Sequence, residues 1–281
     1  MNNFFLITNR AKDPDSIYTA RITEYLKVRG AQVSCVVFDR MAEHTQVPKE
    51  AECAVVLGGD GTLLKAARDM IEYEIPLIGV NLGTLGYLAE VEIGNVEMAL
   101  DMILEDKYTR EYRMMLDGRV CRKEKSEVNN FALNDIVISR CGPLQILQFD
   151  IYVNGRFLNW YSADGIIVAT PTGSTGYNMS AGGPIAEPGA SLILLTPICP
   201  HTLNTRSIIL SQEDEVTIVI PNGKENAVQT VEASFDGTHK VTLTTGDRVV
   251  IKKASKTTGI LKLNTESFLE ILHKKMSGSD K

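Results

Sequence analysis

The chain has 281 residues, of which 44% are hydrophobic and 23% are charged, and its formal net charge is −6. This length allows one large domain or two ordinary ones, and the composition is that of a folded globular protein. The acidic balance argues against a general nucleic-acid surface, because such a surface needs a basic face to neutralise phosphates.

The start of the chain and its cysteines indicate a reducing compartment. Residues 1–8 lack a basic region and a long apolar core, so they predict a first strand rather than a signal peptide. No run reaches the ~18 apolar residues of a membrane-spanning helix. The five cysteines are odd in number and widely spaced, so we expect most of them, including Cys35 and Cys53, to be small core residues. We therefore expect a cytoplasmic protein without membrane or nucleic-acid partners.

The first hundred residues alternate between strand and helix patterns. Short apolar runs predict strands at 4–8, 33–38, 53–57 and 77–80. Helical spacing predicts helices at 16–29, with Ile17, Ala20 and Leu26 on the apolar face, directly after Thr62, and at 96–104. This order predicts a parallel sheet with helices on both faces.

The most informative segment is Gly58-Gly59-Asp60-Gly61-Thr62, between the third strand and its helix. A glycine-rich turn there places backbone N–H groups and a helix N-terminus at the sheet edge where α/β proteins bind phosphates. A bare carboxylate repels phosphate, so Asp60 would either take a proton from an attacking hydroxyl or hold a metal ion. The alternative is a hairpin turn, but a helix pattern follows instead of a second strand. A second glycine turn, at 83–88, is expected at the same edge.

After about residue 108 the pattern changes to short strands joined by tight turns. Residues 149–158 predict a hairpin with Asn154-Gly155 as its type I′ turn, and further strands are expected at 216–220, 229–235 and 240–244. These strands predict a sandwich or barrel. A final apolar helix cannot bury its face alone and is expected to pack back onto the first domain. The predicted domains are an α/β domain at 1–107, joined by 258–281, and a mostly β domain at 108–257.

Two polar clusters lie in this second half. Asn134 and Asp135 interrupt an apolar strand at 131–138, where an unsatisfied buried group costs ~1–3 kcal/mol. Either a bulge or turn exposes them, or Asn134 recognises a base edge while Asp135 accepts hydrogen bonds from sugar hydroxyls. The second cluster, 164–184, gathers threonines, serines and glycines. It suits a large polar ligand, although an ordinary surface loop is the alternative.

Taken in chain order, these clusters resemble the signatures of the NAD kinase family. The match consists of Gly58–Thr62, the Asn134-Asp135 pair and the loop at 170–184, and the segments 195–203 and 234–237 add to it. Asp135 stands where the family often has Glu, and Gly176 stands where Ala is common. The resemblance spans roughly residues 4 to 270 and agrees with the expected α/β and β domains.

The resemblance implies transfer of a phosphoryl group from ATP or polyphosphate to the 2′-hydroxyl of the adenosine ribose of NAD, giving NADP. Mg²⁺ would accompany the nucleotide, and Asp60 is the protein residue that could contact the ion. Asp60 would be the catalytic residue, Asn134 and Asp135 would hold the adenosine, and Lys65 would either reach phosphate or remain a solvated helix lysine. The other expected substrate-binding residues are Gly59, Gly61, Thr62, Ser162, Asp164, Thr175, Gly176, Tyr177, Asn178, Ser180 and Cys199.

The family resemblance also implies a homodimer or homotetramer formed through the second domain. Residues near Ser162–Asp164 or Cys199 of a second chain would then complete each NAD site. Two other functions compete with this one. A lipid kinase of the diacylglycerol kinase type shares the first glycine loop but needs an apolar or basic membrane-facing surface. A non-catalytic dinucleotide sensor would keep the pocket without turnover, and the intact Asp60 argues against it.

Overall fold

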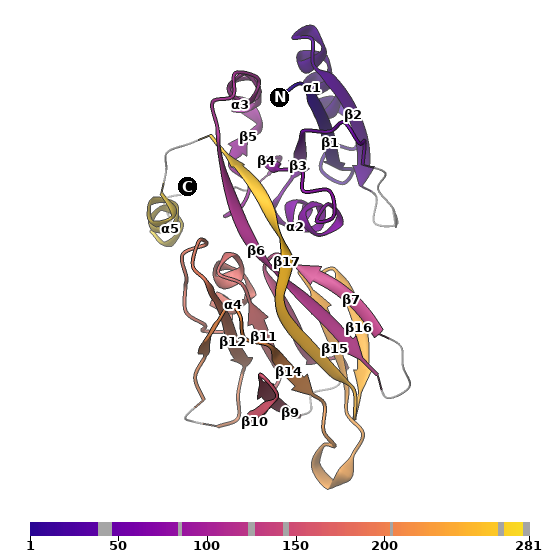
Figure 1. The fold of residues 1–281 in the computed structure, drawn as a ribbon, viewed down its shortest axis with the longest axis vertical. Helices are drawn as coiled ribbons and strands as arrows, with labels where there is room; N and C mark the ends of the chain where they lie inside the picture. Colours follow the sequence, from indigo (N-terminus) through magenta and orange to yellow (C-terminus); the bar gives the residue numbers. More distant parts are fainter. Residues whose placement is uncertain are drawn as a thin grey trace. The chain divides into compact units, whose positions relative to one another are not determined.

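The structure, a computed structural model, describes residues 1–38, 47–83, 86–122, 127–142, 146–202, 205–263 and 267–277. The chain forms two compact units, shown in Figure 1 with their elements labelled. Unit 1 comprises Met1–Arg113 and Lys256–Lys281, and unit 2 comprises Met114–Ser255. Two strands, β6 (Thr109–Cys121) and β17 (Arg248–Lys262), each begin in one unit and end in the other.

Unit 1 is built from alternating strands and helices. Its elements are β1 (Asn3–Asn9), α1 (Ile17–Val28), β2 (Gln32–Phe38), β3 (Cys53–Gly58), α2 (Asp60–Asp69), β4 (Leu77–Asn81), β5 (Val91–Glu92), the 3-10 turn η1 (Ile93–Asn95), α3 (Val96–Leu104) and α5 (Phe268–Met276). The strands pair in the order β2-β1-β3-β4, and β4 also pairs with β5 and with the end of β17. Every one of these pairings is parallel, which confirms the predicted α/β sheet.

Both faces of this sheet are buried. Leu6 and Val55 share a core cluster with α1 and α3, and their chain neighbours Ile7 and Val56 are buried as well. Because successive strand residues point to opposite faces, helices must cover the sheet on both sides. Helix α2 lies outside that cluster and contacts β3 and β4. The glycine-rich turn before α2 is therefore held at the end of a central, fully buried strand.

Of the three apolar residues expected in α1, Leu26 is buried as predicted, whereas Ile17 and Ala20 are not. Thr19, Ile22 and Leu26 are the buried residues, whereas Ile17 is 64% exposed and Ala20 is also exposed. The polar Thr19 can be buried because its hydroxyl donates to Asp13 Oδ2 at 2.7 Å and lies 2.8 Å from the Thr8 hydroxyl. A satisfied hydroxyl thus takes a core position that apolar periodicity alone gives to other residues.

The cysteine prediction also needs correction. All five cysteines are free, and Cys53 alone is buried, where burial raises the pKa of its thiol to about 12. Cys35, Cys141 and Cys199 are exposed. Cys35 lies on β2, which ends the strand order of the described sheet. A strand in that position has a neighbouring strand on one side only, so an apolar run on it need not be fully buried.

The C-terminal helix α5 is grouped with unit 1, as predicted. Just before it, the Leu263 N–H donates to Glu90 Oε1 at 2.8 Å, and within it Lys275 Nζ lies 5.9 Å from the ring centroid of Tyr87. No residue of α5 is buried, so the apolar face predicted for this helix is only partly covered.

Unit 2 is a mostly β structure with two sheets. Its elements are β7 (Glu127–Ala132), β8 (Asp135–Arg140), β9 (Leu147–Val153), β10 (Arg156–Ala163), β11 (Gly165–Ala169), the 3-10 turn η2 (Thr172–Thr175), α4 (Tyr177–Ser180), β12 (Leu192–Ile198), β13 (Ile208–Ser211), β14 (Val216–Val219), the 3-10 turn η3 (Lys224–Asn226), β15 (Thr230–Phe235) and β16 (His239–Thr244). One sheet has the order β13-β12-β11-β8-β15-β16, and the other contains β10-β9-β14 and the first part of β17. The strands in both are antiparallel.

A single core cluster joins the inner faces of these two sheets, with Phe149 and Ile218 from one and Ile166 and Phe235 from the other. This arrangement confirms the predicted sandwich. The predicted hairpin is β9–β10, and its turn has φ 50° at Asn154 and 72° at Gly155, as a type I′ turn requires.

The outer face of the six-stranded sheet carries the loop that the sequence singled out. Ile167 and Leu194 on that face form a separate cluster against which Ala181 and Ala186 pack. The loop at 170–190 is thereby anchored to the sheet through apolar contacts.

Candidate active site

In unit 1 the candidate site is built at the carboxyl end of β3. Gly59 has an extended backbone and precedes the first residue of α2, Asp60. The carbonyl of Gly59 accepts hydrogen bonds from the N–H groups of Thr62 at 2.9 Å and Leu63 at 3.2 Å. A helix follows the glycine turn, so the hairpin alternative is wrong. Open space surrounds the Cβ positions of Gly59 and Gly61, which leaves the backbone there accessible to a ligand.

The Asp60 carboxylate is held by three backbone donors. The Tyr87 N–H donates to Oδ2 at 2.8 Å, and the N–H groups of Leu88 and Ala89 donate to Oδ1 at 3.2 Å each. The two glycine turns therefore meet at one edge of the sheet, as predicted. A carboxylate has about four lone-pair sites, so three donors leave room for one more, such as a hydroxyl or a cation. A Cβ at Gly86 would overlap the Asp60 carboxyl group, which explains a glycine at that position.

The turn is tied to its neighbours through amide side chains. Asn9, at the end of β1, donates from Nδ2 to Thr62 Oγ1 at 3.1 Å. Asn81, at the end of β4, accepts from the Gly83 N–H at 3.0 Å and donates to the Gly83 carbonyl at 2.9 Å. The predicted substrate-binding hydroxyl of Thr62 is thus buried and engaged with Asn9, and its role in this geometry is to fix the turn.

Lys65, the lysine predicted either to reach phosphate or to remain solvated, lies within α2. Burial raises the pKa of Asp69, and the charges of Arg68 and Lys65 oppose that rise. The contact of Lys65 with phosphate stays a prediction. Lys12 lies nearer the edge, with Nζ 3.4 Å from the Cβ position of Gly83. The sequence prediction did not include Lys12, because nothing in its own segment sets it apart.

In unit 2 the predicted strand at 131–138 is interrupted. A turn at Leu133 and Asn134 separates β7 from β8, and Asp135 is the first residue of β8. The Asp236 carboxylate holds this turn. Its Oδ2 accepts from the Leu133 N–H at 2.9 Å, and its Oδ1 accepts from the N–H groups of Asn134 at 2.8 Å and Asp135 at 3.2 Å.

Asn134 and Asp135 have unusual environments: one has a buried oxygen without a partner among the described residues, and the other has a raised pKa. Asp135 is 6% exposed, and burial, together with the nearby Asp236 carboxylate, raises the pKa of Asp135 to about 7. Asn134 Oδ1 is buried and accepts no hydrogen bond from any described residue. The Cβ position of Gly176 lies 3.3 Å from Asn134 Nδ2 and 3.8 Å from Asp135 Oδ2. These three residues, the acceptor cluster, place an orphaned amide oxygen and a titrating carboxyl group side by side.

The threonine-rich loop is an ordered scaffold, which rules out the ordinary surface loop. Thr170 and Ser174 are fully buried. Thr170 Oγ1 donates to the Leu133 carbonyl at 2.6 Å, and Ser174 Oγ donates to the Ala186 carbonyl at 3.1 Å. These hydroxyls, which suggested a polar ligand, thus form hydrogen bonds within the protein that hold the loop in place.

The prediction that Asn178 binds substrate does not fit this geometry. Asn178 is fully buried, and its Nδ2 donates to the carbonyls of Ser174 at 3.2 Å and Pro184 at 2.9 Å. Its Oδ1 accepts from Thr196 Oγ1 at 2.7 Å. The side chain closes the loop onto β12 and has no polar atom left facing solvent.

The remaining predicted residues fall into two groups. Thr175 and Gly176 are half-buried, and Tyr177 and Ser180 are exposed on the open side of the loop that follows β11. The second group lies at the other end of β11: Asp164 pairs with Arg140 at 3.8 Å, the backbone carbonyl of Ser162 accepts from the His201 N–H at 2.8 Å, and Cys199 is exposed. The five residues of β11 separate the groups by about 17 Å. Within one chain, therefore, Ser162, Asp164 and Cys199 do not join the acceptor cluster.

Sequence reasoning missed Asp236 as a site residue. The Asp236-Gly237 pair signals a tight turn, confirmed by φ values of 47° and 69°, but nothing in the sequence shows which backbone its carboxylate holds. The backbone donors at Tyr87–Ala89 were missed for the same reason.

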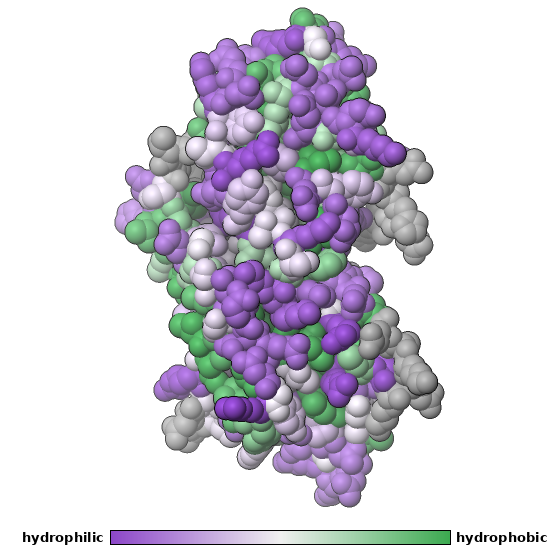
Figure 2. Space-filling view, viewed as in Figure 1, coloured by the Kyte–Doolittle hydropathy of each residue, from purple (hydrophilic) through white to green (hydrophobic). Residues whose placement is uncertain are grey.

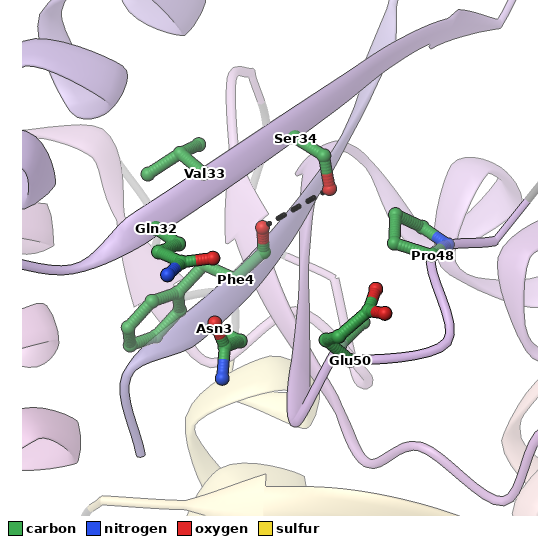
Figure 3. A pocket seen from close by; sticks show the side chains of 8 residues that line it. Asn3, Phe4, Gln32, Val33, Ser34, Pro48 and Glu50 are labelled. Atoms are coloured by element: carbon green, nitrogen blue, oxygen red, sulfur yellow. Dashed lines mark hydrogen bonds between the residues drawn. The ribbon is translucent and has the colours of Figure 1, made fainter.

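A separate pocket of about 180 Å³ lies at the amino ends of β1 and β2 (Figure 3). It is at the opposite end of the unit 1 sheet from Asp60, since all these strands are parallel. Its described lining includes Asn3, Gln32, Ser34 and Glu50 and contains no basic residue, so it is poorly suited to phosphate.

Comparisons with known proteins agree with these motifs. The model of the ATP-NAD kinase N-terminal domain matches residues 8–108, and that of the ATP-NAD kinase C-terminal domain matches residues 133–263. An NAD kinase from Lachnospira eligens is 45% identical over 98% of this chain and 100% of its own length. An NAD kinase from Agathobacter rectalis is 49% identical over 98% of this chain and 99% of its own.

Two solved structures share the fold. Yeast NADH kinase complexed with NADH has a TM-score of 0.82 and 25% identity, covering 99% of this chain and 88% of that one. An NAD kinase from Archaeoglobus fulgidus in complex with ATP has a TM-score of 0.77 and 25% identity, covering 98% and 99%. The chain therefore belongs to the NAD kinase family, as its three motifs and their order predict.

Proposed function

We propose that this NAD kinase transfers the terminal phosphoryl group of ATP to the 2′-hydroxyl of the adenosine ribose of NAD, giving NADP. The NAD kinase activity follows from membership of the family, and one observation supports the proposed chemistry. The Asp60 carboxylate is fixed by three N–H donors at a helix N-terminus and keeps room for one further donor. A phosphoryl transfer needs little else from a protein than such positioning and charge stabilisation.

In unit 1 we assign the phosphates to the N-terminus of α2. Its dipole and the accessible backbone at Gly59 and Gly61 favour an anion. Asp60 would accept the hydrogen bond, and then the proton, of the attacking hydroxyl. The described residues contain no cluster of three metal-ligating side chains. A Mg²⁺ would be held mainly by the ATP phosphates, whose charge it would neutralise, and Asp60 would keep its remaining acceptor position for the hydroxyl.

In unit 2 we assign the adenosine half of NAD to the acceptor cluster. The unpartnered Asn134 Oδ1 suits the exocyclic amino group of adenine, and the Asp135 carboxylate suits the hydroxyl of the ribose diol that does not donate to Asp60. Thr175, Tyr177 and Ser180, on the open side of the loop, would contact the rest of the dinucleotide. These roles make residues 108–257 the NAD-binding part of the chain.

No helix among the described residues is long and apolar enough to span a membrane. The lipid kinase alternative finds less support, because the family models that match this chain are those of the ATP-NAD kinases. On the face drawn in Figure 2, hydrophilic residues are spread among smaller apolar groups, whereas a lipid kinase needs a continuous apolar or basic surface. The sensor alternative requires a pocket that binds the dinucleotide without turnover. The three N–H donors that fix the Asp60 carboxylate argue against it, because binding alone does not need this carboxylate.

We also propose a homodimer or homotetramer. Strand β10 ends the order of its described sheet and exposes Phe157, Leu158 and Trp160, next to a pocket of about 420 Å³. An exposed apolar edge strand is a pairing surface. The separation of Asp164 and Cys199 from the acceptor cluster leaves them available to a neighbouring copy. Light scattering at assay concentration tests this, and a fully active species of 30.9 kDa would contradict it.

A panel of donors and acceptors tests the activity. The purified chain is incubated with Mg-ATP or inorganic polyphosphate, and with NAD, NADH or diacylglycerol. We expect NADP from NAD and ATP and no phosphorylated lipid. Lipid phosphorylation would support the rival enzyme, and NAD binding without NADP from any donor would support the sensor.

A further inference from the structure

We propose that Asp236 is a positioning residue for NAD, which holds the Asn134-Asp135 turn and couples binding of the ribose diol to release of a proton. This inference rests on the proposed function, because it takes the acceptor cluster to be the adenosine site. It goes beyond that function by assigning a role to a carboxylate that need not touch the substrate.

The geometry makes Asp236 the fixed point of the turn. Its carboxylate accepts all three successive N–H groups from Leu133 to Asp135, and its own N–H donates to the Asp135 carbonyl at 3.0 Å. Asp236 is itself buried in the β15–β16 turn, and β15 pairs directly with β8. Since Asn134 Oδ1 has no hydrogen-bond partner among the described residues, the direction of the amide depends on how Asp236 holds the backbone of the turn.

The electrostatics make Asp236 more than a backbone clamp. The pKa of Asp135 is raised mainly by burial and further by the Asp236 carboxylate, because two neighbouring buried carboxyl groups disfavour being ionised together. From β11 and its loop, the residues nearest Asp135 are Ala169 and Gly176, which are uncharged. The β15–β16 hairpin also carries Glu232 and Lys240, which pair with each other at 2.8 Å, and His239, whose ring lies 5.9 Å from that of Phe235.

The coupling follows from which form of Asp135 binds sugar. An ionised carboxylate can accept a hydrogen bond from a ribose hydroxyl at either oxygen, whereas the protonated acid offers fewer acceptors. With a pKa of about 7, Asp135 is partly protonated at neutral pH and must lose that proton as NAD binds. The KM for NAD should therefore rise as the pH falls, about tenfold between pH 8 and pH 6.

The test compares Asp236→Asn with Asp247→Asn. Asparagine at 236 keeps an oxygen for two of the N–H groups but removes the charge, so the rise in KM should move to lower pH and shrink to a few-fold over the same range. Asp247 is a second buried turn aspartate of unit 2, whose Oδ2 accepts from the Thr244 N–H at 2.9 Å. Its variant should keep the wild-type pH profile. His239→Gln should keep it too, and a shift there would overturn the assignment to Asp236.

Calorimetry of NAD binding in buffers of different ionisation enthalpy gives a second readout that does not need turnover. The wild type should release a fraction of a proton per NAD at pH 7, and Asp236→Asn should release clearly less. Asp135→Asn should release none and should lack the rise in KM, which keeps the proposal testable if Asp236→Asn does not fold. An Asp236→Asn variant with an unchanged pH profile and proton release, or with equal losses at every pH, would overturn the inference. Proton-linked NAD binding without NADP formation would instead overturn the proposed function alone.

Discussion

Ionisation of Asp135 should make unit 2 less stable as the pH rises, and Asp135→Asn should remove that effect. Burial and Asp236 raise the pKa of Asp135 from 3.8 to about 7. Between these values the folded chain holds a proton that the unfolded chain releases, so the free energy of unfolding falls as pH rises. The loss is complete just above the folded pKa, and the stability is fully regained only below the unfolded value.

The magnitude follows from the shift. Roughly three pH units at about 1.4 kcal/mol each give at most about 4 kcal/mol in total. About two of those units lie above pH 5. The variant should therefore gain about 2 to 3 kcal/mol relative to the wild type between pH 5 and pH 8.5.

Urea unfolding monitored by tryptophan fluorescence measures this in the relevant unit. The chain has one tryptophan, Trp160, which lies on β10 of unit 2 and is 53% exposed. The midpoints of wild type and Asp135→Asn are compared at pH 5 and pH 8.5. A difference between the two proteins that is the same at both pH values would refute the reasoning, because it would mean that Asp135 ionises without cost.

Three further predictions concern the clamp, the loop and the assembly. Gly86→Ala should displace Asp60 and reduce NAD kinase activity by at least ~100-fold. The control is Gly94→Ala, whose added Cβ meets no atom within 4 Å and which should keep the wild-type activity. Equal activities of the two variants in steady-state assays would show that the close fit at Gly86 is unimportant. Asn178→Ala leaves the buried hydrogen-bond partners of the amide unsatisfied, so thermal denaturation should show a loss of about 1 to 3 kcal/mol in the free energy of unfolding. An unchanged melting temperature with a raised KM for NAD would restore the substrate-binding role. Trp160→Ser should lower the mass measured by sedimentation equilibrium at a given concentration; an unchanged mass would place the interface elsewhere.

The order of the elements was predictable because each carries a local signal. The buried run of β3, the glycine turn and the helical spacing after it fix the strand-turn-helix unit within about twenty residues. The bounds expected for 96–104 are those of α3, and the Asn154-Gly155 turn has the backbone its residues require. Local chemistry also placed the two glycine turns at one edge, because parallel strands end together.

What the sequence could not supply are contacts made far along the chain. The 131–138 run looks like one strand, and it breaks because Asp236, about a hundred residues later, captures its N–H groups. Asn178 looks like any polar loop residue until Thr196 and Pro184 are seen around it. Cys35 is exposed although it lies in an apolar run, and that run does not reveal that β2 ends the strand order of its described sheet.

In the proposed mechanism the Asp60 carboxylate, held by the backbone of the second glycine turn, acts on the hydroxyl of NAD that receives the phosphoryl group. The most direct measurement compares the wild type and Asp60→Asn for NADP formation from NAD and Mg-ATP, with NAD affinity measured in parallel by calorimetry. We expect the wild type to form NADP and the variant to bind NAD with similar affinity while turning over at least ~100-fold more slowly. Equal turnover by the two proteins, or a variant whose only defect is weaker NAD binding, would contradict the account.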